Sequence, residues 1–283
     1  MATFTNRATL SYSGGTVDSN TVTGTFLETL AITKTAILQT YSTGSRITYV
    51  IGFVNSGSTP FSGLTLTDNL GGYAFGETTV YPLDYVEGSL LYYVNGTLQA
   101  TPTIGATQPL TVNGISVPAG GNALIVYTAD VGAAAPPVVD GSVVNTATVS
   151  GGGLTEALSA TETITAQNSP DLSITKSLTP TAVPENGTLT YTFLIENSGN
   201  TAAVATDNLT VSDVFDPILE IALVTLNGVA LTPGTDYTYD AATGAFATVP
   251  GLITVDAATF TQGADGTYSV IPGSAVLEVT GTV

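Results

Sequence analysis

Apolar and polar residues alternate along many short stretches of this 283-residue chain. Residues 30–34 read Leu-Ala-Ile-Thr-Lys and residues 64–68 read Leu-Thr-Leu-Thr-Asp, so every second side chain belongs to one face. A period of two is typical of a strand with one buried face. No segment shows sustained helical periodicity, and the chain is rich in Thr, Val and Tyr, which favour strands. The pattern predicts an all-β fold.

The alternating segments occur twice. Residues 30–61 contain Ile-Thr-Lys followed by Asn-Ser-Gly, and residues 172–199 contain the same two signatures in the same order. Many short strands at close spacing are typical of immunoglobulin-like sandwiches. The repeat predicts two such modules, residues 30–167 and residues 168–283.

Two further features recur after each Asn-Ser-Gly. An alternating strand ends in an aspartate, Asp68 in the first copy and Asp213 in the second. An Asn-Gly pair follows, beginning at Asn95 and at Asn227. Asn-Gly is the strongest short-range signal of a hairpin turn, so each copy is expected to contain a hairpin there.

The two copies end differently. The first continues into a strand-like segment, residues 143–152, but the second stops at Val283, before any matching segment. A matching segment lies at the opposite end of the chain, in residues 6–15. We therefore expect the second module to lack its last strands, and residues 1–29 to be a donor arm that supplies them to a neighbouring copy.

The arm has the pattern of a donor strand. Phe4, Asn6, Ala8, Leu10 and Tyr12 share one face at period two. Burying the three large side chains would stabilise the contact by roughly 5–9 kcal/mol, at ~1.5–3 kcal/mol each.

Spacing links the arm to the repeat. Asn145 precedes Lys176 by 31 positions, and Asn6 precedes Lys34 by 28. Because the two spacings are similar, we expect the arm to connect one molecule to the next as residues 145–176 connect the first module to the second. Two alternatives remain open. The arm could be a leftover half-module that is disordered or packed loosely on the first domain, or it could fold back on its own second module.

Charge narrows the possible partners. The net charge is −18 and Lys and Arg total four, so no basic patch can bind nucleic acid or an anionic membrane surface. No run of 18 apolar residues occurs, so no membrane insertion is expected. The first residues lack the basic and apolar regions of a secretion signal, so we expect no signal peptide in this chain.

The chain has no Cys, His or Trp, which excludes disulfides, the common zinc and copper sites, and Ser-His or Cys-His catalysis. We expect no metal, no cofactor and no enzymatic activity on an outside substrate. The acidic loops at 236–240 and 256–265 could hold calcium, but they lack a regular ligand spacing.

The two lysines of the chain, Lys34 and Lys176, occupy the same position of the repeat. Parity places both on the inner face, together with Asp68 and Asn145 of the first module. A core-facing Lys, Asp and Asn are costly unless the three meet. Burial favours a neutral amine, which is a nucleophile, and a protonated carboxyl can polarise an amide. The expected product is a Lys–Asn isopeptide bond, formed once with release of ammonia.

The Ile-Thr-Lys opening, the Thr-Leu-Thr-Asp middle and the Asn-Thr-Ala-Thr-Val close together resemble the tandem conserved-repeat domains (domain of unknown function eleven) of bacterial surface proteins. The resemblance covers nearly the whole chain. It implies an immunoglobulin-like fold, an extracellular structural role and similarity to isopeptide-forming pilin and adhesin modules. Carried across, it implies that Lys34 bonds to Asn145 with Asp68 as the catalytic residue.

In the second module Lys176 and Asp213 match the same pattern, with Asp207 as a rival for the aspartate. No Asn follows in the right place, and Asn6 is the one that fits. The resemblance therefore implies an intermolecular bond between Lys176 and Asn6, with Asp213 as the catalytic residue. The simpler interpretation of these residues is a snorkelling lysine, a strand-end carboxylate and an edge amide.

The leading hypothesis is a structural subunit of an extracellular filament on a cell or spore surface. Its partner is itself, in a head-to-tail homopolymer. The alternative is a surface adhesin whose loops bind a ligand without polymerisation.

Overall fold

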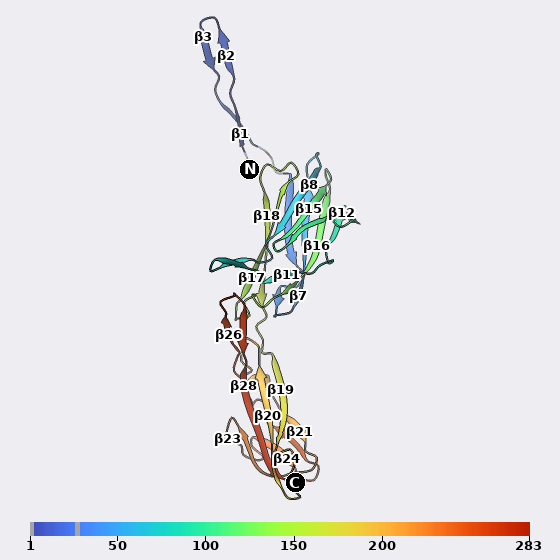
Figure 1. Ribbon diagram of the computed structural model, residues 1–283, viewed down its shortest axis with the longest axis vertical. Coiled ribbons are helices and arrows are strands. Elements are labelled where there is room, and N and C mark those ends of the chain that lie inside the picture. Colours follow the sequence, from blue (N-terminus) through green and yellow to red (C-terminus); the bar gives the residue numbers. More distant parts are fainter. Residues whose placement is uncertain (1–2, 26–28) are drawn as a thin grey trace. The chain divides into compact units, whose positions relative to one another are not determined.

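The computed structural model describes residues 3–25 and 29–283, and nearly all of its regular structure is β-strand (Figure 1). Within these residues the helical structure is one 3-10 turn, η1 (Ala205–Asp207). The predicted all-β class is therefore confirmed. The chain divides into two compact units, Met1–Pro136 with Ser142–Thr165, and Pro137–Gly141 with Ala166–Val283.

The first unit contains a sandwich of two antiparallel sheets. One sheet has the order β13-β12-β16-β7-β5, with β11 also paired to β16, and the other has the order β14-β15-β8-β17-β18-β6. A small hairpin joins β9 to β10. The strands of this sandwich are β5 (Leu30–Ala36), β6 (Thr40–Tyr41), β7 (Arg46–Asn55), β8 (Phe61–Asp68), β9 (Tyr73–Phe75), β10 (Thr78–Val80), β11 (Leu83–Tyr85), β12 (Leu91–Val94), β13 (Thr97–Leu98), β14 (Thr103–Thr107), β15 (Leu110–Val117), β16 (Asn122–Val131), β17 (Ser142–Gly151) and β18 (Leu158–Ala166).

The core of this sandwich follows the period of two. Alternate residues of β7 and β16 are fully buried, and Tyr49 and Tyr127 stack across the two strands with ring centroids 5.4 Å apart. The hairpin β17–β18 covers the same core from the other sheet, where Val143, Ala147 and Val149 are buried.

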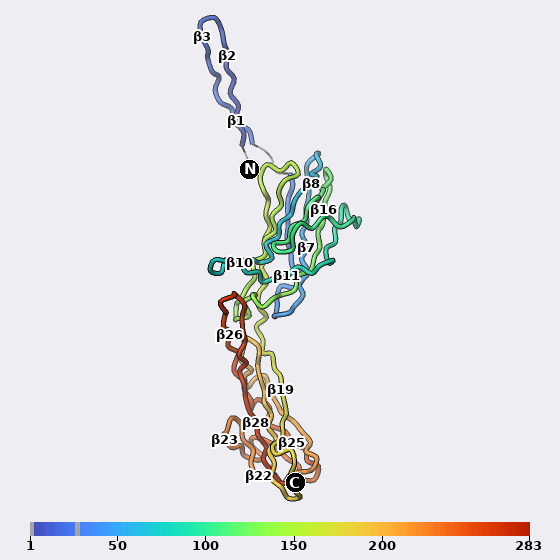
Figure 2. The backbone as a smooth tube through the Cα atoms, in the orientation of Figure 1, coloured from blue at the N-terminus to red at the C-terminus, as the bar shows by residue number. Residues whose placement is uncertain are grey.

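The second unit is built from fewer strands. Its larger sheet has the order β19-β20-β28-β22-β23 and its smaller sheet the order β21-β25-β24, with a separate hairpin β26–β27 (Figure 2). Apolar residues of both sheets form one buried cluster that includes Phe193, Phe215 and Leu277. The strands are β19 (Leu172–Thr179), β20 (Thr188–Asn197), β21 (Ser212–Val214), β22 (Glu220–Leu226), β23 (Val229–Ala230), β24 (Tyr237–Asp240), β25 (Ala245–Thr248), β26 (Thr259–Gln262), β27 (Tyr268–Ile271) and β28 (Gly273–Thr282).

Strand register relates the two sandwiches. Lys34 of β5 pairs with Ile51 of β7, which pairs with Ile125 of β16. In the second unit, Lys176, Phe193 and Leu277 make the same chain of pairs across β19, β20 and β28. The repeated Asn-Ser-Gly also has a structural role, because the buried Asn55 and Asn197 each bind the backbone of the following turn.

The second sandwich has no counterpart of β17 and β18 among the described residues. In the first unit β8 lies between β15 and β17, whereas β21 has β25 on one side and forms the edge of its sheet. The inner face of β19 is exposed as a result. Leu30 of β5 is 3% exposed, but its counterpart Leu172 is 42% exposed.

The strand before the second aspartate is shorter than its pattern predicts. The alternation of residues 209–213 indicates a strand like β8, but β21 begins at Ser212. β21 makes backbone hydrogen bonds to one neighbouring strand, whereas β8 makes them to two. The smaller number of these bonds accounts for the shorter strand.

Both predicted Asn-Gly hairpins are confirmed. Asn95 and Gly96 join β12 to β13, and Asn227 and Gly228 join β22 to β23. All four residues have positive φ, between 47° and 78°, as a two-residue hairpin turn requires.

The described part of the arm is itself a hairpin. Strand β1 (Thr3–Asn6) pairs with β4 (Val22–Thr25), and β2 (Thr9–Tyr12) pairs with β3 (Gly15–Asp18). The register changes between the two pairs, because two residues separate β1 from β2 and three separate β3 from β4, which is the count of a β-bulge. Residues 1–2 and 26–28 of the predicted arm lie outside the described residues.

Candidate functional site

The first candidate site lies inside the first sandwich, between the two sheets. Lys34 comes from β5, Asp68 from the end of β8, and Asn145 from β17. Each of these side chains belongs to the inward set of its strand, and all three residues are buried. The structure thus brings together the three residues that the sequence predicts to meet.

Tyr127 of β16 connects the three residues. The Lys34 ammonium donates a hydrogen bond to Asp68 Oδ2 at 2.5 Å. The Tyr127 hydroxyl donates to the same oxygen at 2.7 Å and accepts from Asn145 Nδ2 at 3.1 Å. The hydroxyl also lies 3.4 Å from Lys34 Nζ. Amine, carboxyl and amide are therefore within one hydrogen-bonded cluster.

Burial tunes the lysine toward nucleophilic attack. Desolvation lowers the pKa of Lys34 from 10.5 to about 8, although the neighbouring Asp68 acts in the opposite direction. Its ammonium also lies 4.9 Å from the centroid of the Tyr49 ring. A buried amine with a lowered pKa is neutral in a larger fraction of molecules, and the neutral form is the one that attacks a carbonyl.

Two polar atoms of the site have no hydrogen-bond partner among the described residues. They are Asn145 Oδ1 and the hydroxyl oxygen of Tyr49, and both are buried. An unsatisfied buried carbonyl oxygen costs about 1–3 kcal/mol, and a catalytic role is one of the reasons for which proteins keep such a group.

The sequence did not predict a role for either tyrosine. The available signal was their parity, because Tyr49 and Tyr127 share the face of the inward apolar residues of β7 and β16 and pair with each other. A buried tyrosine hydroxyl needs a partner, so two of them in one core would have indicated a polar cluster.

The second candidate site has the same lysine and aspartate in a more open setting. Lys176 forms an ion pair with Asp213, and the lysine side chain is 40% exposed. Its ammonium lies 4.3 Å from the ring centroid of Tyr191 and 5.4 Å from those of Phe193 and Phe215. The rival Asp207 lies in η1 instead, where Oδ2 accepts a hydrogen bond from the Val204 backbone.

The second site lacks an amide in the place of Asn145 within the described residues, since no strand there corresponds to β17. Asn6, the residue that the sequence assigns to this place, lies at the end of β1 and pairs with Val22 of β4. The apolar residues predicted for the donor face are exposed, with Leu10 67% exposed and Phe4 and Tyr12 at least half exposed. Ala8, which lies between β1 and β2, is also exposed and binds Ser19.

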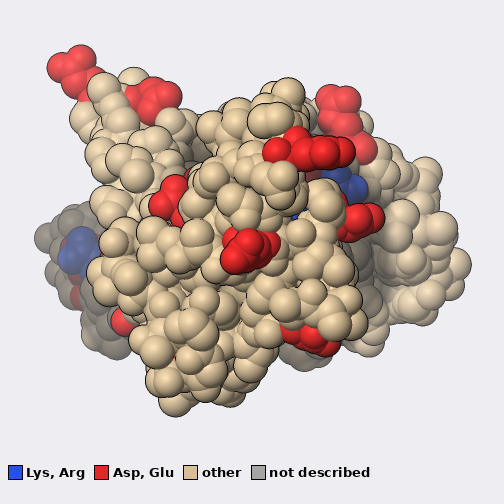
Figure 3. Space-filling view, turned by 90° about the horizontal axis from the view of Figure 1, so that it is seen from below, with Lys and Arg blue, Asp and Glu red and all other residues tan. Residues whose placement is uncertain are grey.

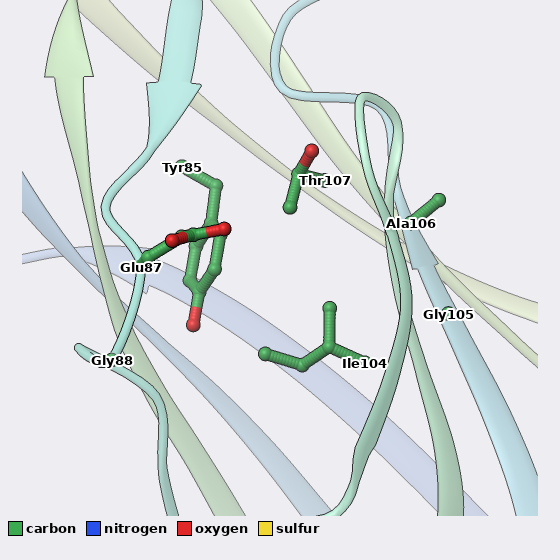
Figure 4. Close-up of a pocket in the computed structure, with 7 residues that line it drawn as sticks. All are labelled: Tyr85, Glu87, Gly88, Ile104, Gly105, Ala106 and Thr107. Atoms are coloured by element: carbon green, nitrogen blue, oxygen red, sulfur yellow. The ribbon is translucent and has the colours of Figure 1, made fainter.

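An open groove of about 520 Å³ lies in the first unit, between the end of β11 with the residues that follow it and β14 (Figure 4). Tyr85, Glu87 and Thr107 supply its polar side chains, and Ile104 faces Tyr85 from β14. The Tyr85 hydroxyl oxygen is buried without a partner in the described part of the chain.

Acidic side chains are scattered rather than gathered into one site. Figure 3 shows them as separate spots on a largely uncharged face. Among the described residues, no group of three or more acidic side chains is close enough to hold a metal ion. No helix in the described part has the length and apolarity needed to cross a membrane.

No family model and no curated protein matches this chain, so the resemblance to the conserved-repeat domains stays a prediction. The major pilin subunit of Bacillus cereus is similar over 96% of this chain and 73% of its own, at 12% identity and a TM-score of 0.36. The pilus backbone protein of Streptococcus pneumoniae is similar over 90% of this chain and 50% of its own, at 10% identity and a TM-score of 0.36. The collagen-binding subdomain of the Enterococcus faecalis surface protein ACE is similar over 51% of this chain and 100% of its own, at 10% identity and a TM-score of 0.32. All three TM-scores lie below 0.5, so these similarities do not assign a function to this chain.

Proposed function

We propose that the chain is a structural subunit of an extracellular filament, in which the arm of one copy completes the second sandwich of the next. The observation that carries the proposal is the contrast between β5 and β19. Within the described residues, the inner face of β5 is buried in a sandwich whose other sheet includes the hairpin β17–β18, whereas the same face of β19 is exposed and the edge of β21 is unpaired.

The arm has the form that this gap requires. It is a two-stranded hairpin, as β17–β18 is, and cross-strand partners share a face. Leu10 pairs with Val17, and Phe4 pairs with Gly24 so closely that its ring occupies the space of a side chain at position 24. One face of the hairpin is therefore largely apolar, while Thr and Ser residues and the Arg7–Asp18 ion pair occupy the other.

The first sandwich supplies the register for docking. Ala147 lies opposite Asp68 in the pairing of β17 with β8. If the arm takes the same place beside β21, Ala8 lies opposite Asp213, and Asn6 stands where Asn145 stands in the first site. Main-chain hydrogen bonds to the free edge then stabilise the contact by β-strand addition, together with burial of Phe4 and Leu10, whose counterparts Val143 and Val149 are buried.

Docking would also complete the second reactive cluster. The arm would cover Lys176 and place the Asn6 amide beside it, with Asp213 as the acid. Lys176 Nζ then bonds to Asn6 Cγ and ammonia leaves, so the contact becomes covalent. In the first sandwich the same reaction joins Lys34 to Asn145 within one molecule.

Such a contact propagates. The donor surface and the acceptor surface differ, so each docked copy still offers one of each, and an open filament results unless the ends close into a ring. A chain without cysteine would in this way obtain a covalent fibre suited to a cell or spore surface.

The filament is tested by boiling the assembled protein in detergent and separating it on a denaturing gel. Wild type is expected to give a ladder of multimers, and Asn6→Ala is expected to give monomer. Asn145→Ala is the matched control, because it removes an asparagine of the same local pattern and should leave the ladder intact. A wild-type protein that runs as monomer contradicts the intermolecular bond.

A ligand-binding adhesin is the second candidate, and the open groove that Tyr85, Glu87 and Thr107 line favours it. Binding to a glycan array that is lost in Glu87→Ala while the ladder persists would support this role. The same array with no bound glycan would leave the groove without a function.

A further inference from the structure

The two reactive clusters differ at one buried position. Tyr49 of the first site pairs with Tyr127, whereas Tyr191, its counterpart by register, pairs with Val279. Val279 is fully buried and carries no hydroxyl. The group that links carboxyl and amide in the first site is thus absent from this position in the second.

Another aromatic ring fills the space. Phe215, two residues after Asp213, stacks on Tyr191 with centroids 5.1 Å apart, much as Tyr127 stacks on Tyr49. The residue two positions after Asp68 is Leu70, which is aliphatic and buried. The second cluster therefore keeps the stacked pair but loses the phenol between carboxyl and amide.

We propose that Tyr127 is a catalytic residue of bond formation at Lys34, relaying a proton from Asp68 to the amide nitrogen that leaves Asn145. The inference rests on the proposed function, since it presumes the isopeptide bond. The second site, with Val279 in this place, joins molecules more slowly than the first site closes on itself.

The proton balance follows from the contacts. The Lys34 ammonium first passes one proton to Asp68, with which it shares a hydrogen bond, leaving a neutral amine and a neutral acid. The amine nitrogen attacks Asn145 Cγ to give a tetrahedral intermediate. An amide nitrogen has its lone pair in resonance with the carbonyl, but in the intermediate that lone pair is free to accept a proton.

Tyr127 is the donor in position at that moment, because its oxygen lies 3.1 Å from Asn145 Nδ2. Its hydroxyl proton moves to Nδ2 as it takes the proton of Asp68 through their 2.7 Å hydrogen bond. The Cγ–Nδ2 bond breaks and ammonia leaves. The attacking nitrogen gives its surplus proton to Asp68, which ends protonated, and Tyr127 ends as it began.

The test follows ammonia loss by intact-mass spectrometry during cell-free synthesis of the full chain. Positioned acid–base groups contribute about 10²–10⁴-fold in rate, so Tyr127→Phe is expected to slow the loss at least about 100-fold. Asn145→Ala supplies the baseline without an intramolecular bond. A wild-type monomer that never loses ammonia contradicts the bond itself, whereas Tyr127→Phe reacting at the wild-type rate overturns the relay and leaves the bond standing.

Fluorotyrosines of graded acidity at position 127 distinguish proton transfer by the hydroxyl from a purely structural role of Tyr127, because they keep the ring and its packing. If the hydroxyl proton is transferred in the transition state, the rate of ammonia loss changes with the acidity of the hydroxyl. An unchanged rate overturns the proposal. Transplanting the first site into the second, with Val279→Tyr and Phe215→Leu together, is expected to speed growth of the covalent ladder. An assembled variant that grows no faster overturns the role given to Val279.

Discussion

A lysine and an aspartate form an ion pair in both sandwiches, and their surroundings give them different chemistry. Lys34 is 5% exposed and lies between the two sheets of a complete sandwich, and this burial lowers its pKa. Lys176 has water on one side and three aromatic rings on the other. In the proposed filament, docking of the arm removes that water, so the second amine becomes reactive when its partner amide arrives.

The lowered pKa of Lys34 predicts a pH dependence of stability. The folded pKa of about 8 lies below the ordinary 10.5, so between these values the unfolded chain binds more protons than the folded one. Stability therefore rises with pH in this window, by up to about 1.4 kcal/mol per pH unit. Urea unfolding of Asn145→Ala, which keeps the free amine, should show the rise between pH 8 and about 9.5. In the double variant Asn145→Ala with Lys34→Met, the free energy of unfolding should not change over this pH range. Equal pH dependence in the single and double variants would contradict the assignment of the rise to Lys34.

The bond between residues 34 and 145 predicts a large contribution to stability. A cross-link that closes a loop of roughly 100 residues stabilises a fold by up to about 5 kcal/mol through the unfolded state. Asn145→Ala and Lys34→Met each remove that link, so both should lower the free energy of unfolding of the first sandwich. Their effects should be far from additive in the double variant, because either change already removes the whole bond. Additive losses would indicate that no bond joins the two residues.

At the scale of elements, the arm has one apolar face, which is expected to dock, and one polar face, which is expected to stay in solvent. Leu10 belongs to the apolar face and its neighbour Ser11 to the polar one, and both are exposed in the described hairpin. The hairpin is already paired before docking, which lowers the conformational entropy lost on association.

Leu10→Asp is expected to abolish filaments, because docking would bury a charge in place of a side chain that contributes about 1.5–3 kcal/mol. Ser11→Asp, which puts the same charge on the neighbouring residue, should leave assembly intact, since the counterpart Ser150 of β17 is exposed. Electron microscopy of the two variants compares them directly. Filaments from Leu10→Asp would show that this face does not enter the acceptor.

Much of this arrangement can be predicted from the sequence. The period of two identifies the strands, and parity places Lys34, Asp68 and Asn145 in one core. Other features depend on neighbours that a local pattern does not reveal. Residues 209–211 alternate like a strand but have no second pairing partner in the described part of the chain. Tyr127 has the pattern of an ordinary core residue, and only the structure shows its hydroxyl between Asp68 and Asn145.

At the scale of the whole molecule, every copy in the proposed filament donates its own arm and accepts the arm of a neighbouring copy in its second sandwich. A contact in which the same surface of two copies meets itself would produce closed dimers, whereas distinct donor and acceptor surfaces allow growth to continue. The net charge of −18 discourages copies from associating side by side, which favours growth along one direction.

The most direct measurement mixes two full-length variants, each lacking one half of the joint. Lys176→Ala keeps a donor asparagine but no acceptor amine, and Asn6→Ala keeps the amine but no donor asparagine. After boiling in detergent, each alone should run as monomer, and the mixture should yield a covalent dimer and nothing larger, with Asn6 joined to Lys176 in its peptide map. A mixture that yields only monomer, or a ladder from either variant alone, would contradict the account.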